Sequence, residues 1–148
     1  MKAQSAIEYL MIIAIALGII VPTTYLFFRY TSESNVEVVY SQINQIGRQI
    51  MDTAETVYFS GKGSKIILEV NMPKGINDIY VLADRELVFK IFSEIGDNEL
   101  VFFPPANIPI TEGTGDLTDI ASSGLKKIKI EAVDGVGGTE VSISKFVS

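Results

Sequence analysis

The chain has 148 residues, with 18 acidic and 12 basic side chains and a formal net charge of −6. It contains no cysteine, histidine or tryptophan, which excludes disulfides, thiolate metal sites, cysteine nucleophiles and acid–base or triad chemistry that depends on histidine. The acidic balance disfavours nucleic acid as a partner, and no motif indicates a cofactor, a small-molecule substrate or an enzymatic reaction.

The chain begins with a short basic leader, Met1 to Ala3, and the next residues lead into a long apolar run. From Tyr9 to Phe28, twenty residues carry no formal charge. Because about 20 residues at about 1.5 Å each span the hydrocarbon core of a bilayer, this run predicts a membrane-spanning helix. Glu8 lies at the edge of the run, where an ionisable group is costly, and it therefore indicates a function that requires a partner.

One long helix in two parts is expected over residues 4–60, ending near Phe59. The part over 9–28 forms the membrane or filament core, and the part over 36–59 is amphipathic. In the second part apolar residues recur at steps of three and four, and they are Val36, Val39, Tyr40, Ile43, Ile46, Ile50, Met51, Ala54, Val57 and Tyr58. This stripe predicts either packing on the chain's own β domain or a surface shared with neighbouring subunits.

Three local signals modify this helix. Pro22 lacks a backbone donor and is expected to kink or loosen the helix, whereas Thr23 and Thr24 offer hydroxyl groups to the freed carbonyl. Residues 31–35 form a weakly helical patch where the membrane or filament core would end. Gly61-Lys62-Gly63 is then expected to stop the helix.

Beyond Gly63 the pattern changes to short β runs, which predict a β-rich headgroup over 61–148 after a leader at 1–3 and a helix at 4–60. The fold class is therefore α+β, with an antiparallel, sandwich-like headgroup. The candidate strands are Lys65–Met72, Ile76–Ala83, Glu86–Phe92, Glu99–Phe103, Lys126–Val133 and Glu140–Val147.

Alternation of apolar and polar residues assigns the faces of the last two strands. Ile128, Ile130 and Ala132 share one face, opposite the charged residues between them. The strand over 140–147 gives a less tidy assignment, because serine and apolar residues alternate with a lysine on the apolar side.

Turn residues connect these strands. Residues 83–86 and 134–138 are typical of hairpin turns. Residues 104–124 form a long connection rich in proline, glycine and threonine, with room for a short strand around Ile108–Thr111. Loops of this length inside a small domain tend to be functional or mobile.

The segment Ala3-Gln4-Ser5-Ala6-Ile7-Glu8-Tyr9-Leu10, followed by an apolar helix, resembles the class III signal peptide of archaeal type IV pilin-like proteins. The resemblance covers these eight residues and the helix, and the rest of the chain matches in layout only. It implies cleavage between Ala3 and Gln4 by a prepilin peptidase on the cytoplasmic side. It also implies a long N-terminal helix bundled in a filament core, with a β-rich headgroup outside.

Such cleavage would create a free α-amine on Gln4, one helical turn before Glu8. A carboxylate in an apolar bundle needs a counter-charge, and the amine of Gln4, from the same or a neighbouring subunit, is the nearest candidate. We therefore expect Gln4 and Glu8 to set the register of subunits during assembly. The simpler alternative is that Glu8 is a first-turn acid favoured by the helix dipole beside the lipid headgroups.

Residues within the apolar run are expected to pack helix against helix. The predicted packing residues are Ile12, Ile13, Ile19, Ile20, Pro22, Phe27 and Phe28. The small residues at positions 14, 16 and 18 permit close approach of helices, or they are ordinary membrane-helix composition. The aromatic cluster over 25–30 fits a membrane-interface belt and gap filling in a bundle equally well.

The preferred reading is a structural subunit of an archaeal type IV pilus-like filament that serves surface adhesion. Its expected partners are copies of itself in a helical polymer, the membrane before assembly, and the prepilin peptidase with the pilus assembly machinery. Its expected location is the cell membrane and afterwards an extracellular filament. The alternative is a signal-anchored extracytoplasmic binding module, or a minor pilin, that does not form the body of the fibre.

Overall fold

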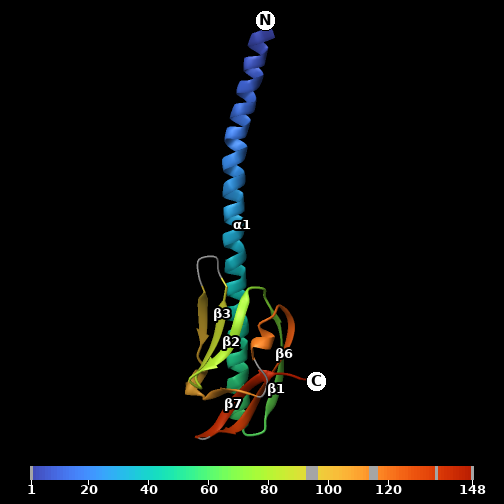
Figure 1. Cartoon of the computed structure of the whole chain (residues 1–148). Helices are drawn as coiled ribbons and strands as arrows, with labels where there is room; N and C mark the ends of the chain where they lie inside the picture. Colours follow the sequence, from blue (N-terminus) through green and yellow to red (C-terminus); the bar gives the residue numbers. More distant parts are fainter. Residues whose placement is uncertain (1, 93–96, 114–116, 136, 148) are drawn as a thin grey trace. The chain divides into compact units, whose positions relative to one another are not determined.

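The computed structural model describes residues 2–92, 97–113, 117–135 and 137–147, without the side chains of residues 2–5 and 31–36 (Figure 1). The chain divides into two compact units, Met1–Val38 and Val39–Ser148. The first unit is helix alone. The second unit contains the end of the helix, all of the described strands and two short 3-10 helices.

Helix α1, Lys2–Ser60, is a single α-helix that continues through Pro22 and through residues 31–36. Proline at position 22 removes the hydrogen bond to the carbonyl of Gly18. The Thr23 hydroxyl donates to the carbonyl oxygen of Ile19 at 2.7 Å. Thr23 therefore does not compensate the Gly18 carbonyl as predicted, because its hydroxyl bonds the next carbonyl along. The proline nevertheless does not interrupt the helix.

Glycine ends α1 where the sequence predicts it. Ser60 is the last helical residue, and Gly61 and Gly63 both have positive φ angles. The Gly61 N–H donates to the Tyr58 carbonyl at 3.2 Å, which satisfies one of the carbonyls left without a partner at the helix end. A side chain at either glycine would be strained, because L-residues rarely adopt this backbone conformation.

The second unit contains two sheets, and the predicted α+β fold is confirmed. The four-stranded sheet has the order β1-β6-β7-β5, and the three-stranded sheet has the order β2-β3-β4. The strands are β1 (Lys65–Met72), β2 (Ile76–Leu82), β3 (Glu86–Ile91), β4 (Asn98–Phe102), β5 (Ile110–Glu112), β6 (Gly124–Gly135) and β7 (Gly138–Lys145). The 3-10 helices are η1 (Pro105–Asn107) and η2 (Leu117–Ile120).

The strand ends and one pairing differ from the sequence prediction. All six predicted strands are present, with ends that differ by up to two residues, and β5 is the short strand expected in the 104–124 connection. The correction concerns orientation, because β5 pairs with β7 in parallel while every other described pair is antiparallel. A parallel pair requires a crossover instead of a tight turn, and the chain between β5 and β7, which includes η2 and β6, supplies it.

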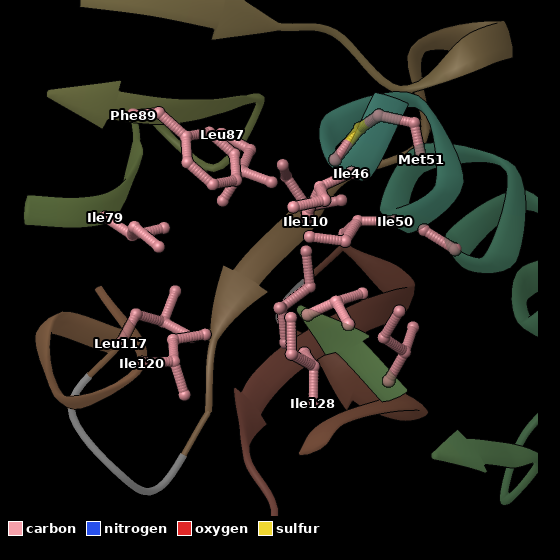
Figure 2. Packing of buried hydrophobic residues seen from close by; sticks show 14 of the residues in the cluster. Ile46, Ile50, Met51, Ile79, Leu87, Phe89, Ile110, Leu117, Ile120 and Ile128 are labelled. Atoms are coloured by element: carbon pink, nitrogen blue, oxygen red, sulfur yellow. The ribbon is translucent and has the colours of Figure 1, made fainter. Parts of the chain in front are cut away.

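The amphipathic part of α1 packs into the core of the second unit (Figure 2). Its buried residues are Ile43, Ile46, Ile50, Met51, Ala54 and Val57. They meet the inner faces of both sheets, including Leu87 and Phe89 of β3, Ile110 of β5 and Ile128 of β6. The interpretation that this stripe packs on the chain's own β domain is therefore confirmed, except at Val36, whose side chain lies outside the described residues.

Both hairpins form where turn residues predict them. The turn between β2 and β3 places Ala83 and Asp84 at positive φ, which matches the twist of a tight hairpin. The β6–β7 hairpin closes between Gly135 and Gly138.

The irregular alternation of serine and apolar residues in β7 has a structural reason, which is that both faces of this strand are covered. Val141, Ser142, Ile143 and Ser144 are all buried, because β7 lies between β6 and β5 and both of its faces are covered. Gly113 lies against the serine face, where an added Cβ would fall 2.3 Å from the Ser142 Oγ. The Ser144 hydroxyl is buried without a hydrogen-bond partner within the described part of the chain.

Candidate functional site: the exposed apolar helix

The segment Ala6–Tyr30 of α1 is long and apolar enough to cross a membrane, and none of it is buried within the described chain. Its large apolar side chains are between 40% and 72% exposed. A helix that is apolar on all sides is not stable in water and requires lipid or protein around it. We call residues 6–30 the exposed apolar helix. It is the surface of the first unit that lipid or another protein has to cover.

The predicted packing residues all lie on this surface. Each of them is exposed in the single chain, namely Ile12, Ile13, Ile19, Ile20, Pro22, Phe27 and Phe28. At about 100° per residue they are distributed around more than half of the helix circumference. The structure thus presents these side chains to the surroundings but does not bring them together, and their role in packing stays a prediction.

Glu8 lies on the same helix, one turn after Gln4, and its side chain is exposed. It makes no ion pair within the described residues. Residues 1–3 precede Gln4 in the chain, so the Gln4 nitrogen is part of a peptide bond and not an amine. Ala3 and Gln4 belong to α1, but their side chains lie outside the described residues. Cleavage after Ala3 and pairing of Gln4 with Glu8 remain predictions.

The end of the apolar helix nearer residue 30 carries the aromatic cluster. Phe27 and Phe28 meet edge to face, with ring centroids 6.4 Å apart. Tyr25 and Tyr30 are exposed on the same stretch, which also contains Arg29. Aromatic and arginine side chains of this kind favour the boundary between hydrocarbon and water.

Gly18 leaves open space in the middle of the apolar helix. Apart from the neighbouring backbone of α1 itself, no atom lies within 4 Å of the position that a Cβ would take there. The predicted close approach of a second helix is therefore sterically available at Gly18.

The second unit holds a polar network that the sequence analysis did not single out. Tyr80, Lys90, Asp97 and Glu99 lie on the outer face of β2-β3-β4, where the Lys90 Nζ is 3.2 Å from Asp97 Oδ2. Burial, and then the neighbouring Glu99 carboxylate, raise the pKa of Tyr80. The hydrogen bond to Asp97 raises the pKa of Lys90. The alternation of Asp78, Tyr80 and Leu82 was the available signal for this face.

The geometry of both units gives a pilin-like architecture at a coarse level, namely an exposed apolar N-terminal helix followed by a β-sheet unit with its own core. Comparison with family models, with curated proteins and with solved structures finds no match for this chain. The layout is pilin-like. No group of three or more acidic side chains in the described residues is arranged to hold a metal ion.

Proposed function

We propose that this protein is a structural, non-enzymatic subunit of an archaeal type IV pilus-like filament. The single observation that carries the proposal is the exposed apolar helix, Ala6–Tyr30, joined to a β-rich unit that already has a closed core. The Gln4-to-Leu10 segment at the start of that helix supports the proposal, because it resembles a class III signal peptide.

The apolar helix has two suitable environments. Before assembly, lipid surrounds residues 6–30, and after assembly, copies of the same helix surround them. The transfer is feasible because lipid tails and a helix bundle are similarly apolar, so small gains in van der Waals packing decide the balance. Contacts between unlike surfaces of identical subunits then extend into a helical fibre.

Processing would prepare the helix for this transfer. Cleavage between Ala3 and Gln4 by a prepilin peptidase removes Lys2 and creates an α-amine on Gln4. In the apolar interior of a bundle, the Glu8 carboxylate needs a positive partner, and that amine supplies it. The charge pair would fix how far one helix slides along the next.

The location follows from the two environments. The subunit is held in the cell membrane before assembly and lies in an extracellular filament afterwards, and its β-rich unit serves surface adhesion. The membrane, the peptidase and the pilus assembly machinery are its transient partners, and other copies of the chain are its lasting ones.

Shearing of cells that express the full chain tests the proposal. The sheared fraction is separated from membranes, and the N-terminal peptide of the protein is identified by mass spectrometry. We expect a polymer in the sheared fraction whose chains begin at Gln4. A protein that stays monomeric in the membrane fraction would support the signal-anchored binding module instead.

A further inference from the structure

A cavity of about 210 Å³ lies between the β2–β3 hairpin and the segment that follows β4, and we call it the hairpin cavity. In Figure 1 the end of β2 lies beside this segment. A backbone hydrogen bond joins the two parts nearby, because the Ile110 N–H donates to the Asp84 carbonyl at 3.0 Å. The lining residues are Arg85, Glu86, Phe103, Pro104, Asn107 and Ile108.

The hairpin cavity combines buried apolar residues with an exposed aromatic ring. Pro104 and Ile108 are buried, whereas Phe103 is 65% exposed. Phe103 is also absent from the hydrophobic core of the second unit. Its ring is therefore not needed for core packing, and most of its surface is free to contact a ligand.

Three polar side chains line the same cavity without partners of their own. Arg85, Glu86 and Asn107 form no side-chain hydrogen bond or ion pair within the described residues. The guanidinium only donates hydrogen bonds, the carboxylate only accepts them, and the carboxamide does both. The charges of Arg85 and Glu86 sum to zero, and Asp84, the neighbouring acid in the turn, does not line the cavity. The cavity therefore offers donors and acceptors together without a net charge.

The backbone beside the cavity has a conformation that costs free energy. Ala106 and Asn107 have φ angles of 57° and 52°, in the left-handed region that alanine seldom adopts. They follow Pro104 and Pro105, whose own φ angles are fixed by their rings. Backbone strain of this kind clusters at ligand sites. The turn also holds the Asn107 carboxamide at the cavity before a ligand arrives, which lowers the entropic cost of binding.

We infer that the hairpin cavity binds one sugar ring of an uncharged glycan. A sugar ring has C–H groups on its face, which suit the aromatic ring of Phe103. Each hydroxyl at its edge both donates and accepts, and it finds a matching group among Arg85, Glu86 and Asn107. Glu86 would repel a phosphate or a carboxylate, and Arg85 would repel an amine.

The size of the cavity limits the ligand to one small ring, because pockets for drug-sized molecules measure about 300–1,000 Å³. The rest of a glycan would extend into solvent. This inference rests on the proposed function, since it names the class of molecule to which the β-rich unit adheres.

Saturation-transfer NMR on the full chain tests the inference. The chain is held in micelles of a detergent without a sugar headgroup, so that the detergent does not compete. The probes are glucose, galactose, mannose and N-acetylglucosamine, with N-acetylneuraminic acid and inorganic phosphate as charged comparisons. We expect at least one neutral sugar to bind, with the strongest signals on the C–H protons of its ring.

Two variants locate the binding site. Phe103→Ala removes the aromatic ring, and Asn107→Gly removes the carboxamide while glycine accepts the positive φ without strain. Each should weaken binding of that sugar at least about fivefold, as expected for one lost hydrogen bond or contact. The matched control Phe92→Ala removes a ring that is 64% exposed outside the cavity, and it should bind normally. Arg85→Gln, at an exposed turn position, replaces Phe103→Ala in the test if that variant does not fold.

Three outcomes overturn the inference. In the first, no neutral sugar binds, and in the second a charged comparison binds more tightly than every neutral sugar. In the third, the sugar binds equally well to the unmodified chain and to the cavity variants.

The sheared fraction separates this inference from the filament proposal. A chain that forms filaments but binds no neutral sugar contradicts the inference alone. A chain that binds a sugar through Phe103 but stays monomeric in the membrane supports the inference and contradicts the filament proposal.

Discussion

The ring of Phe102 lies directly over Gly47, so that a Cβ added to Gly47 would fall 2.4 Å from the Phe102 Cζ. Phe102 also meets Phe89 edge to face, with ring centroids 5.5 Å apart. A helix interior normally disfavours glycine by about 1 kcal/mol relative to alanine. Glycine at position 47 therefore lowers the intrinsic helix propensity of α1 but allows α1 and β4 to pack closely.

Gly47→Ala should lower the stability of the second unit. Overpacking costs about 1–3 kcal/mol, which exceeds the gain of about 1 kcal/mol in helix propensity, and a ring fixed against Phe89 has little room to move. Urea unfolding of the full chain in detergent, followed by near-ultraviolet circular dichroism, measures the change. Gly18→Ala is the matched control and should leave this transition unchanged, because its Cβ meets nothing within 4 Å. Equal midpoints for the two variants would contradict the packing argument.

Ser144→Ala should leave stability unchanged or raise it by up to about 1 kcal/mol, because the hydroxyl is desolvated without a hydrogen bond in return. The reciprocal change Ala132→Ser, at a buried position of the neighbouring strand, should destabilise by about 1–3 kcal/mol. The same urea titration measures both variants. A marked loss on Ser144→Ala would mean that the hydroxyl has a partner.

Glu8→Gln should reduce filament yield by more than about tenfold, because the α-amine of Gln4 would then be left unpaired in an apolar interior. The measurement is the amount of subunit in the sheared fraction relative to the membrane fraction. Glu37→Gln, which neutralises an exposed acid further along α1, is the control and should assemble normally. Normal yield with Glu8→Gln would indicate that the acid is only a first-turn residue.

Alkaline pH should destabilise the second unit in part through Tyr80. Because the folded-state pKa of Tyr80 is raised, its phenol holds its proton more tightly when folded. Its contribution is complete below the unfolded pKa of about 10 and is lost as the pH rises through the folded value. The pKa of Lys90 is also raised. Its contribution to stability is likewise lost as the pH rises above the ordinary lysine value of about 10.5.

Absorbance titration of tyrosinate isolates the Tyr80 contribution. Comparison with Tyr80→Phe identifies its signal, and Glu99→Gln should shift that signal to lower pH, because the neighbouring carboxylate is one cause of the raised pKa. Burial, the larger cause, should keep the pKa above its usual value even in Glu99→Gln. An unchanged titration in Glu99→Gln would show that Glu99 does not act on Tyr80.

The elements of this fold were predictable because their signals are local. The stripe from Ile43 to Val57 has the helical period, and Ile128, Ile130 and Ala132 alternate as a half-buried strand does. The parallel β5–β7 pair was not predictable, since nothing in either strand specifies their relative orientation and η2 and β6 separate them in the chain. The burial of Ser142 and Ser144 likewise depends on Gly113 lying against them, which is a long-range contact.

The candidate site also has one part that local sequence predicts and another that depends on contacts between distant residues. The exposed apolar helix is a continuous run of sequence, so the uncharged stretch from Tyr9 to Phe28 alone predicted its position. The outer face of β2-β3-β4 depends on cross-strand register, because Tyr80, Val88 and Val101 come together only when these strands pair.

Helical reconstruction of sheared filaments by electron cryomicroscopy tests the central claim most directly. The account predicts a fibre whose interior is a bundle of the Ala6–Tyr30 segments, with each chain beginning at Gln4 and the β-rich units outside. A fibre in which these segments lie at the periphery, or preparations in which every copy remains alone in lipid, would contradict it.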